Sequence, residues 1–218
     1  MKYLITIVAL LMTVSSPFAA EKSAEERLKE IVDLQSETVA LGKASETWAA
    51  YIAGDYEAAL KEWRPLAEAG DTSAQVYLGI MHNQGHGVPQ DDQEAVRWYK
   101  LAAEKGYSPA QWRLAVLYKT GTGIIQDYQE AVRLYKLVAE AGDAYAQNAL
   151  GEMFRNGLGV SEDKVMAYVW FDISGSNGYE LGETYRDQMA KKMTSQEITK
   201  AQTMVSKCID SDYKSCEY

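Results

Sequence analysis

Small and apolar residues recur through the middle of the chain with the spacing of one helix face. In one segment, Ala95, Val96, Tyr99, Ala102 and Ala103 stand at positions i, i+1, i+4, i+7 and i+8, which places them on one side of a helix with 3.6 residues per turn. Polar and charged residues fill the positions between them. The segment therefore predicts an amphipathic helix with a single buried face.

A second helix follows with the same spacing. Ala110, Leu114 and Leu117 line one face, and Ser108-Pro109 predicts its start as an N-cap followed by a first-turn proline. A Gly-x-Gly stretch comes next, and glycine accepts the positive φ of a tight turn without strain. The two segments together predict an antiparallel pair of helices.

The pair is copied along the chain with a period of 36 residues. Asp, Ala, aromatic and Gly columns each recur four times without an insertion. These columns are Asp55, Asp91, Asp127 and Asp163; Ala59, Ala95, Ala131 and Ala167; Trp63, Tyr99, Tyr135 and Phe171; and Gly70, Gly106, Gly142 and Gly178. In such an array each pair buries its apolar stripe only against its neighbours. The predicted fold class is all-α, a right-handed α-solenoid of helix-turn-helix repeats with a concave face.

The first twenty residues have the order of a secretory signal peptide. Lys2 precedes an almost unbroken apolar run, and small residues lead to Ala20. The run is too short to span a bilayer comfortably, so we expect no membrane span once the signal is removed. The predicted address is outside the cytoplasm, either the periplasm or the secreted fraction.

The remaining segments predict an array with capped ends. We expect an N-terminal helical cap over residues 21–49, the repeat array over 50–178, and a C-terminal capping helix with a Cys-containing tail over 179–218. Near the C-terminus, Thr194-Ser195-Gln196-Glu197 is a capping box that predicts the start of a helix.

The two cysteines, Cys208 and Cys216, lie close together in the tail. In an oxidising compartment they predict a disulfide, which would close a short loop. The alternative is a redox-active pair, but the spacing is not C-x-x-C and no flanking motif supports that chemistry.

Charge makes one class of partner improbable. The formal net charge is −9 with 22 basic and 31 acidic residues. A protein that binds nucleic acid by neutralising phosphates is usually basic. We therefore expect no nucleic-acid partner.

Two sets of residues suggest chemistry, and the repeat pattern explains both of them otherwise. His82 and His86 have the spacing of helical metal ligands, but His82 falls in a packing column with Tyr118 and Phe154. Lys119-Thr120-Gly121, with Ser161 and Ser211 each starting an S-x-x-K, resembles the motif set of a serine β-lactamase. The serines follow the K-T-G, which reverses the expected order. We expect no enzyme, no metal and no cofactor.

The repeat unit resembles a known family. The pattern Ala-x-x-x-Leu-Gly-x-x-aromatic-x-x-Gly-x-Gly-Val, followed by an Asp-started helix ending in Ala-Ala-Glu-x-Gly, is similar to the Sel-one-like repeat of exported bacterial proteins, a relative of the tetratricopeptide repeat. Residues 74–106, 110–142 and 146–178 carry it, with Ala115 in place of the usual Gly. The resemblance implies a scaffold that binds another protein or peptide in its concave groove, as an adaptor or regulator.

The resemblance also places the Ala-Gln helix of each repeat on the concave side. Positions that differ between repeats are candidates for recognition, because packing alone favours similar residues in every unit. The candidate groove residues are Val76, Ile80, Asn83, Trp112, Val116, Lys119, Tyr145, Asn148, Glu152 and Arg155. Trp112 is a typical interface anchor, or alternatively it packs on the neighbouring helix.

Two other functions stay open from the sequence. One is an envelope hydrolase with β-lactamase-like or cell-wall activity, and the other is a regulator whose groove senses a small ligand. The basic columns through Arg97 and Lys100 give a further possible partner stripe. However, the pairs Arg64/Glu68, Lys100/Glu104 and Lys136/Glu140 favour a solvated outer face.

Overall fold

The computed structural model describes residues 46–214 and 216, and contacts divide the chain into two units, 1–49 and 50–218. The predicted signal peptide and almost all of the predicted N-terminal cap lie outside the described residues. In the part that is described, the chain forms helices and turns with no strand, so the all-α class is confirmed. No helix there is long and apolar enough to cross a bilayer.

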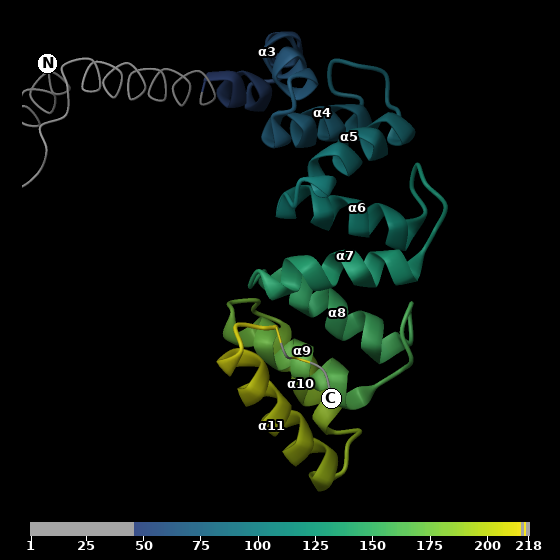
Figure 1. Cartoon of the computed structure of the whole chain (residues 1–218), viewed down its shortest axis with the longest axis vertical. Helices are drawn as coiled ribbons and strands as arrows, with labels where there is room; N and C mark the ends of the chain where they lie inside the picture. The colour runs from purple at the N-terminus through teal and green to yellow at the C-terminus, as the bar shows by residue number, and fades with distance from the viewer. Residues whose placement is uncertain (1–45, 215, 217–218) are drawn as a thin grey trace, which may run out of the picture. The chain divides into compact units, whose positions relative to one another are not determined.

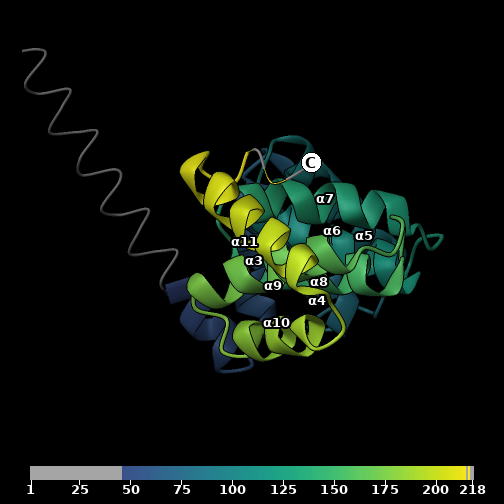
Figure 2. The ribbon, with the colours of Figure 1, turned by 90° about the horizontal axis from the view of Figure 1, so that it is seen from below.

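The second unit is a stack in which each helix of the array packs against the next (Figures 1 and 2). Corresponding helices start 36 residues apart, as the sequence period predicts. The helices are α3 (Tyr56–Glu68), α4 (Thr72–Gln84), α5 (Asp92–Glu104), α6 (Ser108–Thr120), α7 (Tyr128–Glu140), α8 (Ala144–Asn156), α9 (Lys164–Ser176), α10 (Gly182–Ala190) and α11 (Ser195–Asp210).

Aspartates start most of the array helices. The Oδ1 atom of Asp91 accepts hydrogen bonds from the backbone N–H groups of Gln93 and Glu94, at 3.0 Å each, which satisfies donors that have no intrahelical partner. α6 differs, because Tyr107 occupies the N-cap position and makes no side-chain cap. The prediction of Ser108 as N-cap was wrong by one residue, since Pro109 fits the first turn in either register.

The core is built from the repeated columns. All four alanines of the Ala column are fully buried, and the aromatic column is at most 4% exposed. Small residues let successive helices approach closely, and the rings fill the space between them. In each repeat a Gln side chain donates from Nε2 to a backbone carbonyl of the preceding helix; the pairs are Gln75 with Ala67, Gln111 with Ala103 and Gln147 with Ala139.

The second glycine of the Gly-x-Gly turn joins one repeat to the previous one. Gly159 has φ +72°, and a Cβ there would overlap the backbone of Tyr128 and Gln129 at the start of α7. Gly123 meets Asp92 of α5 in the same way. Only glycine permits this approach between backbones, which explains why the turn is copied with the period.

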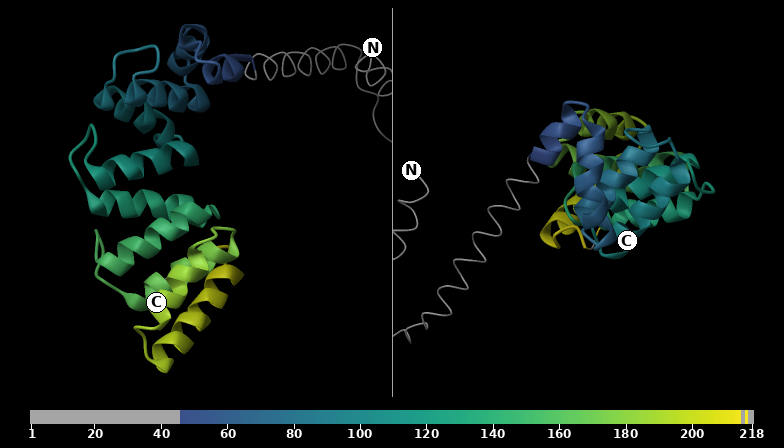
Figure 3. Two further views of the ribbon diagram at one scale, coloured as in Figure 1. Left: turned by 180° about the vertical axis from the view of Figure 1, so that it is seen from behind. Right: turned by 90° about the horizontal axis from the view of Figure 1, so that it is seen from above.

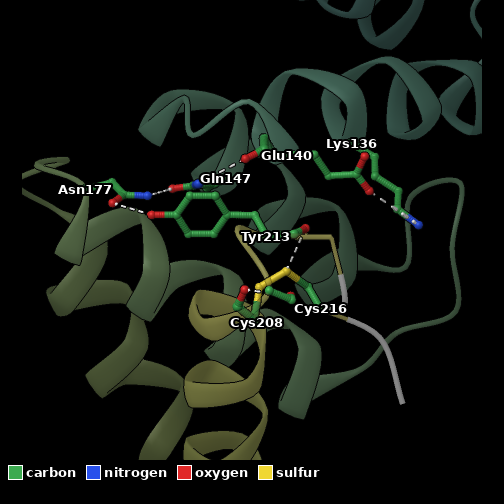
Figure 4. Close-up of a disulfide and its surroundings, with 9 residues drawn as sticks. Lys136, Glu140, Gln147, Asn177, Cys208, Tyr213 and Cys216 are labelled. Carbon is green, nitrogen blue, oxygen red and sulfur yellow. Dashed lines mark hydrogen bonds and ion pairs between the residues drawn. A yellow bond between two sulfur atoms is a disulfide. The ribbon is translucent and has the colours of Figure 1, made fainter.

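The C-terminal helices close the last repeat. α10 and α11 both pack on α9 (Figures 1 and 3). α11 starts with the predicted capping box: Thr194 accepts from the backbone N–H of Glu197, whose carboxylate accepts from the Thr194 N–H at 2.7 Å. After α11, a disulfide joins Cys208 to Cys216 with their Cα atoms 4.4 Å apart. The tail is thereby held against the array (Figure 4).

Candidate binding surface

The candidate groove residues lie on α4, α6 and α8, the helices that the Ala-Gln pairs begin, with Tyr145 in the first turn of α8. Val76 and Asn148 are buried at 5% and 8% exposure, so their side chains are covered by the fold. The other eight are partly or fully exposed. One contact between repeats joins two of them, Lys119 on α6 and Glu152 on α8.

Trp112 packs against a neighbouring helix and remains partly exposed. Its ring centroid is 5.2 Å from that of Tyr135 on α7, with the planes tilted by 58°. Tyr135 itself is 2% exposed, while Trp112 keeps part of its ring in solvent. The Trp is thus fixed by an edge contact with a buried ring, which suits a rigid anchor because little side-chain entropy is left to lose on binding.

An ion pair connects two repeats across this surface. Lys119 Nζ on α6 lies 3.4 Å from Glu152 Oε2 on α8, and both side chains stay about one-third exposed at 34% and 31%. An exposed pair of this kind contributes at most about 1 kcal/mol to stability. Burial raises the pKa of Tyr135, and the nearby Glu152 carboxylate raises it further. The phenol therefore stays neutral beside this carboxylate.

Aromatic rings continue the surface beyond Glu152. Tyr145 is 63% exposed, and its ring meets Tyr179 edge-on at 5.3 Å. The Arg155 guanidinium lies 5.6 Å from the ring centres of both Phe171 and Tyr185, within the range of a cation–π interaction.

Tyr179 and Tyr185 were missed by the sequence reasoning. Tyr179 aligns at the 36-residue period with Tyr107 but with Asp143 in the repeat between them, and Tyr185 lies in α10, after the array helices. The available signal was the match of Tyr179 to Tyr107, and for Tyr185 only the abundance of Tyr in the chain, with 15 residues.

The candidate residues of α4 belong to the first matched repeat, and their contacts differ from those of the α6 and α8 residues. Asn83 Nδ2 donates to Asp92 Oδ1 at 2.7 Å, which ties the end of α4 to the start of α5. Burial raises the pKa of Tyr99 to about 12, an effect that the nearby Arg113 guanidinium partly offsets. This part of the surface is therefore polar and internally bonded.

The residues that suggested metal binding or β-lactamase chemistry have structural positions in the repeat array or its C-terminal end. Lys119-Thr120-Gly121 ends a helix rather than lying on a strand, and Lys119 binds Glu152. Ser211 follows α11 as its C-cap. His86 Nδ1 lies 2.9 Å from the Tyr51 hydroxyl, and its ring stacks on Tyr56 at 4.3 Å. Among the described residues no group of three or more His, Cys, Asp or Glu could hold a metal ion.

The outer face has fewer i,i+4 ion pairs than expected. Lys136 and Glu140 are 3.9 Å apart. Arg97 and Arg133 instead bind glutamates three residues earlier, with Arg97 Nε donating to Glu94 at 2.8 Å. The Arg97 and Arg133 charges are thus each paired within their own helix.

Comparison with known proteins identifies the repeat. A family model described as the Sel1 repeat matches residues 72–107, 108–143 and 144–179. The comparison with curated proteins gives no match.

Several solved structures are similar, and two of them illustrate the likeness. One is a protective antigen present in uropathogenic Escherichia coli strains that displays an SLR fold, with 31% identity over 72% of this chain and a TM-score of 0.66. The other is a Sel1 repeat protein from Oxalobacter formigenes, with 29% identity over 64% of this chain and a TM-score of 0.59. The chain spans 34% and 55% of their lengths, respectively.

Proposed function

The chain belongs to the Sel1 repeat family, and from that premise we propose that it is an exported scaffold that binds a protein or peptide partner on the surface of α6 and α8. Repeats of this family usually mediate protein interactions, and proteins with this fold are generally non-catalytic scaffolds. The observation that carries the proposal is that non-repeating residues of α6 and α8 stay at least partly exposed, and that the Lys119–Glu152 ion pair joins the two repeats. We name these residues the inner row: Trp112, Val116, Lys119, Tyr145, Glu152 and Arg155.

The composition of the inner row supports recognition of a polypeptide. Trp, Tyr and Arg are enriched where proteins bind one another. The row also carries charges of both signs, which fits a partner with its own mixed charges better than a polyanion. Because Lys119 and Glu152 remain one-third exposed, a partner can reach either group.

Export is part of the proposal. The Cys208–Cys216 disulfide supports it, since such bonds persist in oxidising compartments. The periplasm is the compartment we propose first. Fractionation of cells, followed by alkylation of free thiols in each fraction, tests it: we expect the chain in the periplasm with no reactive thiol.

The binding proposal is tested by identifying the partner and then changing the inner row. A photo-reactive amino acid in place of Tyr145 should trap the partner in intact cells, because this side chain is the most exposed of the row. The trapped protein, once purified, serves as the ligand. Trp112→Ala should then weaken binding at least tenfold, whereas Leu137→Ala on α7 is the control, since Leu137 is exposed outside the row.

A charge swap separates recognition from internal pairing. Lys119→Glu should weaken binding by repulsion within the row and loss of the cation. Lys119→Glu combined with Glu152→Lys restores the internal ion pair but exchanges the positions of the two charges. The double variant should therefore still bind the partner weakly. Binding at the wild-type level by the double variant, or by Trp112→Ala, would reject the inner row as the contact surface.

A further inference from the structure

A second concave site lies between α3 and α5, above α4. It is a crevice of about 620 Å³ whose walls include Arg64 of α3, Gln75 and His82 of α4, and Trp98 and Leu101 of α5. We call it the first-repeat crevice. It contains no residue of the inner row. Its volume is within the range of small ligand sites.

Three polar atoms of this crevice lack hydrogen-bond partners among the described residues: Gln75 Oε1, His82 Nδ1 and Trp98 Nε1. The Gln75 and Trp98 side chains are only 3% and 6% exposed. A buried polar atom without a partner destabilises a fold. The three atoms therefore favour an occupant that offers both a donor and an acceptor.

In the third repeat the chain itself supplies the hydrogen-bond partner that Gln75 lacks (Figure 4). There, Gln147 stands in the place of Gln75, and its Oε1 accepts from Asn177 Nδ2 at 2.9 Å. Asn177 Oδ1 in turn accepts from the Tyr213 hydroxyl at 3.0 Å. Tyr213 belongs to the loop that the disulfide closes. The chain's own residues, including Tyr213 of the tail, thus satisfy the glutamine of the third repeat.

The first and third repeats also differ in how deeply an equivalent apolar side chain is buried. Ile173 on α9 is fully buried, whereas Leu101 and Leu137, at the equivalent positions of α5 and α7, are 37% and 40% exposed. α11 packs on α9, and α5 and α7 have no such cover among the described elements. The exposed Leu101 therefore offers an apolar contact beside the unpaired polar atoms.

The second repeat has a smaller crevice of about 460 Å³, in which Tyr118 and Leu134 stand where the first repeat has His82 and Trp98. It leaves no unpaired buried side-chain atom among the residues described. The crevice is thus shared by the first two repeats, while the unpaired Gln and His atoms belong to the first copy. The indole N–H of Trp98 is less distinctive, because that of Trp170, at the same position of the third repeat, is also unpaired among the described residues.

Charge indicates a neutral occupant. Cations and anions are balanced around the crevice, and Arg97 is already bound by Glu94 through two nitrogens. A phosphate or a nucleic acid would meet as many repelling as attracting groups. The charged residues of the wall are Arg64, Arg97 and Lys105, and Glu68, Glu94 and Glu104.

We propose that the first-repeat crevice binds a short extended segment of a partner polypeptide, whose backbone amides pair with Gln75 and Trp98 and whose apolar side chain covers Leu101. A peptide group carries one donor and one acceptor. Gln75 and His82 are seven residues apart on α4, or about 10.5 Å, which an extended segment of three or four residues spans. This site goes beyond the inner row and does not depend on it.

The test uses a neutral blocked tetrapeptide, acetyl-Gly-Leu-Ala-Gly-amide, and the tryptophan indole N–H signals of the ¹⁵N-labelled chain. We expect a saturable shift of the Trp98 signal at millimolar peptide. Trp170 is the internal control, because it stands at the same repeat position, is 2% exposed, and lies on α9, against which the chain's own α11 packs. Its signal should not move.

Two variants complete the design. Trp98→Leu copies Leu134 of the second repeat, so it is compatible with the fold, and it should weaken peptide binding at least tenfold. Trp112→Ala in the inner row should leave peptide binding unchanged. Absence of a saturable Trp98 shift, or equal affinity in Trp98→Leu by calorimetry, would overturn the proposal.

Two other occupants have distinct signatures. A Trp98 signal that moves with protein concentration would place a second copy in the crevice. A signal that changes when residues 21–45 are removed would place the chain's own N-terminal segment there. Either result would replace a partner peptide as the occupant.

Discussion

We expect the protein to be more stable with glycine than with alanine at position 79, in the middle of α4, although alanine is the better helix former. Gly79 follows Leu78, and the corresponding pairs are Leu114-Ala115 and Leu150-Gly151. A Cβ built on Gly79 lies 2.8 Å or less from three ring atoms of Tyr99. The second repeat already accommodates a Cβ at this place, because Ala115 is fully buried there.

Two opposing terms set the size of the effect. Gly79→Ala should gain about 1 kcal/mol from helix propensity, but forcing a methyl group into a packed core typically costs about 1–3 kcal/mol. The net expectation is a loss of about 1 kcal/mol, since the ring is 1% exposed and has little room to move. A chain of this size would melt about 2–4 °C lower.

The reverse substitution is the matched control. Ala115→Gly loses helix propensity of about 1 kcal/mol and leaves a small void. Both changes should therefore lower the unfolding free energy, although one adds the methyl group that the other removes. Circular dichroism with urea unfolding measures both.

A double-mutant cycle identifies the cause. In a Tyr99→Leu background the ring is gone, so Gly79→Ala should become stabilising. If Gly79→Ala costs the same in both backgrounds, or stabilises the wild type, contact with the Tyr99 ring is not the reason for the glycine.

Two further predictions concern the tail and the first-repeat crevice. Cys216→Ser should lower the unfolding free energy by about 2–3 kcal/mol in the chain-entropy model for so short a loop. Urea unfolding measures this loss, and the wild-type protein with its disulfide reduced should match the variant. An unchanged unfolding midpoint would show that the bond does not restrain the fold. Burial lowers the pKa of His82 below its usual 6.5, so the unfolded chain takes up a proton before the folded chain does, and stability should fall as the pH drops below about 6.5. His82→Tyr, which copies Tyr118, should remove that part of the pH dependence, and identical pH profiles for the two proteins would contradict the assignment. The charged groups near the ring are Glu94, Asp91, Arg64 and Arg97.

The sequence predicted the architecture well because an array depends on local signals. A buried Ala column and an Asp N-cap are each decided within one helical pair, and the period copies them. Ala59 and its three equivalents are all fully buried, as the pattern required. The register of α6 was off by one residue, because Pro109 permits a start at either neighbour.

The candidate surface was predicted less completely. Comparison between repeats indicated Trp112, Lys119 and Glu152, and the structure connects the last two by an ion pair. It could not indicate that Val76 is buried, because a position that varies between repeats can still face the core. Tyr179 matches Tyr107 at the period but Asp143 in the repeat between them, so its column gave no consistent signal, and Tyr185 lies after the array helices.

The sequence by itself determined the helical pairs, their 36-residue repetition and the residues that fill their shared core, since each depends on neighbours close in the chain. Only the tertiary structure decided which of the repeated polar side chains find a partner elsewhere in the chain. The tail that carries Tyr213 returns to the third repeat, whose Asn177 lies 36 positions earlier, and no local pattern encodes that return. The difference between the paired Gln147 and the unpaired Gln75 oxygen is therefore a property of the packed C-terminal end, where the repetition stops.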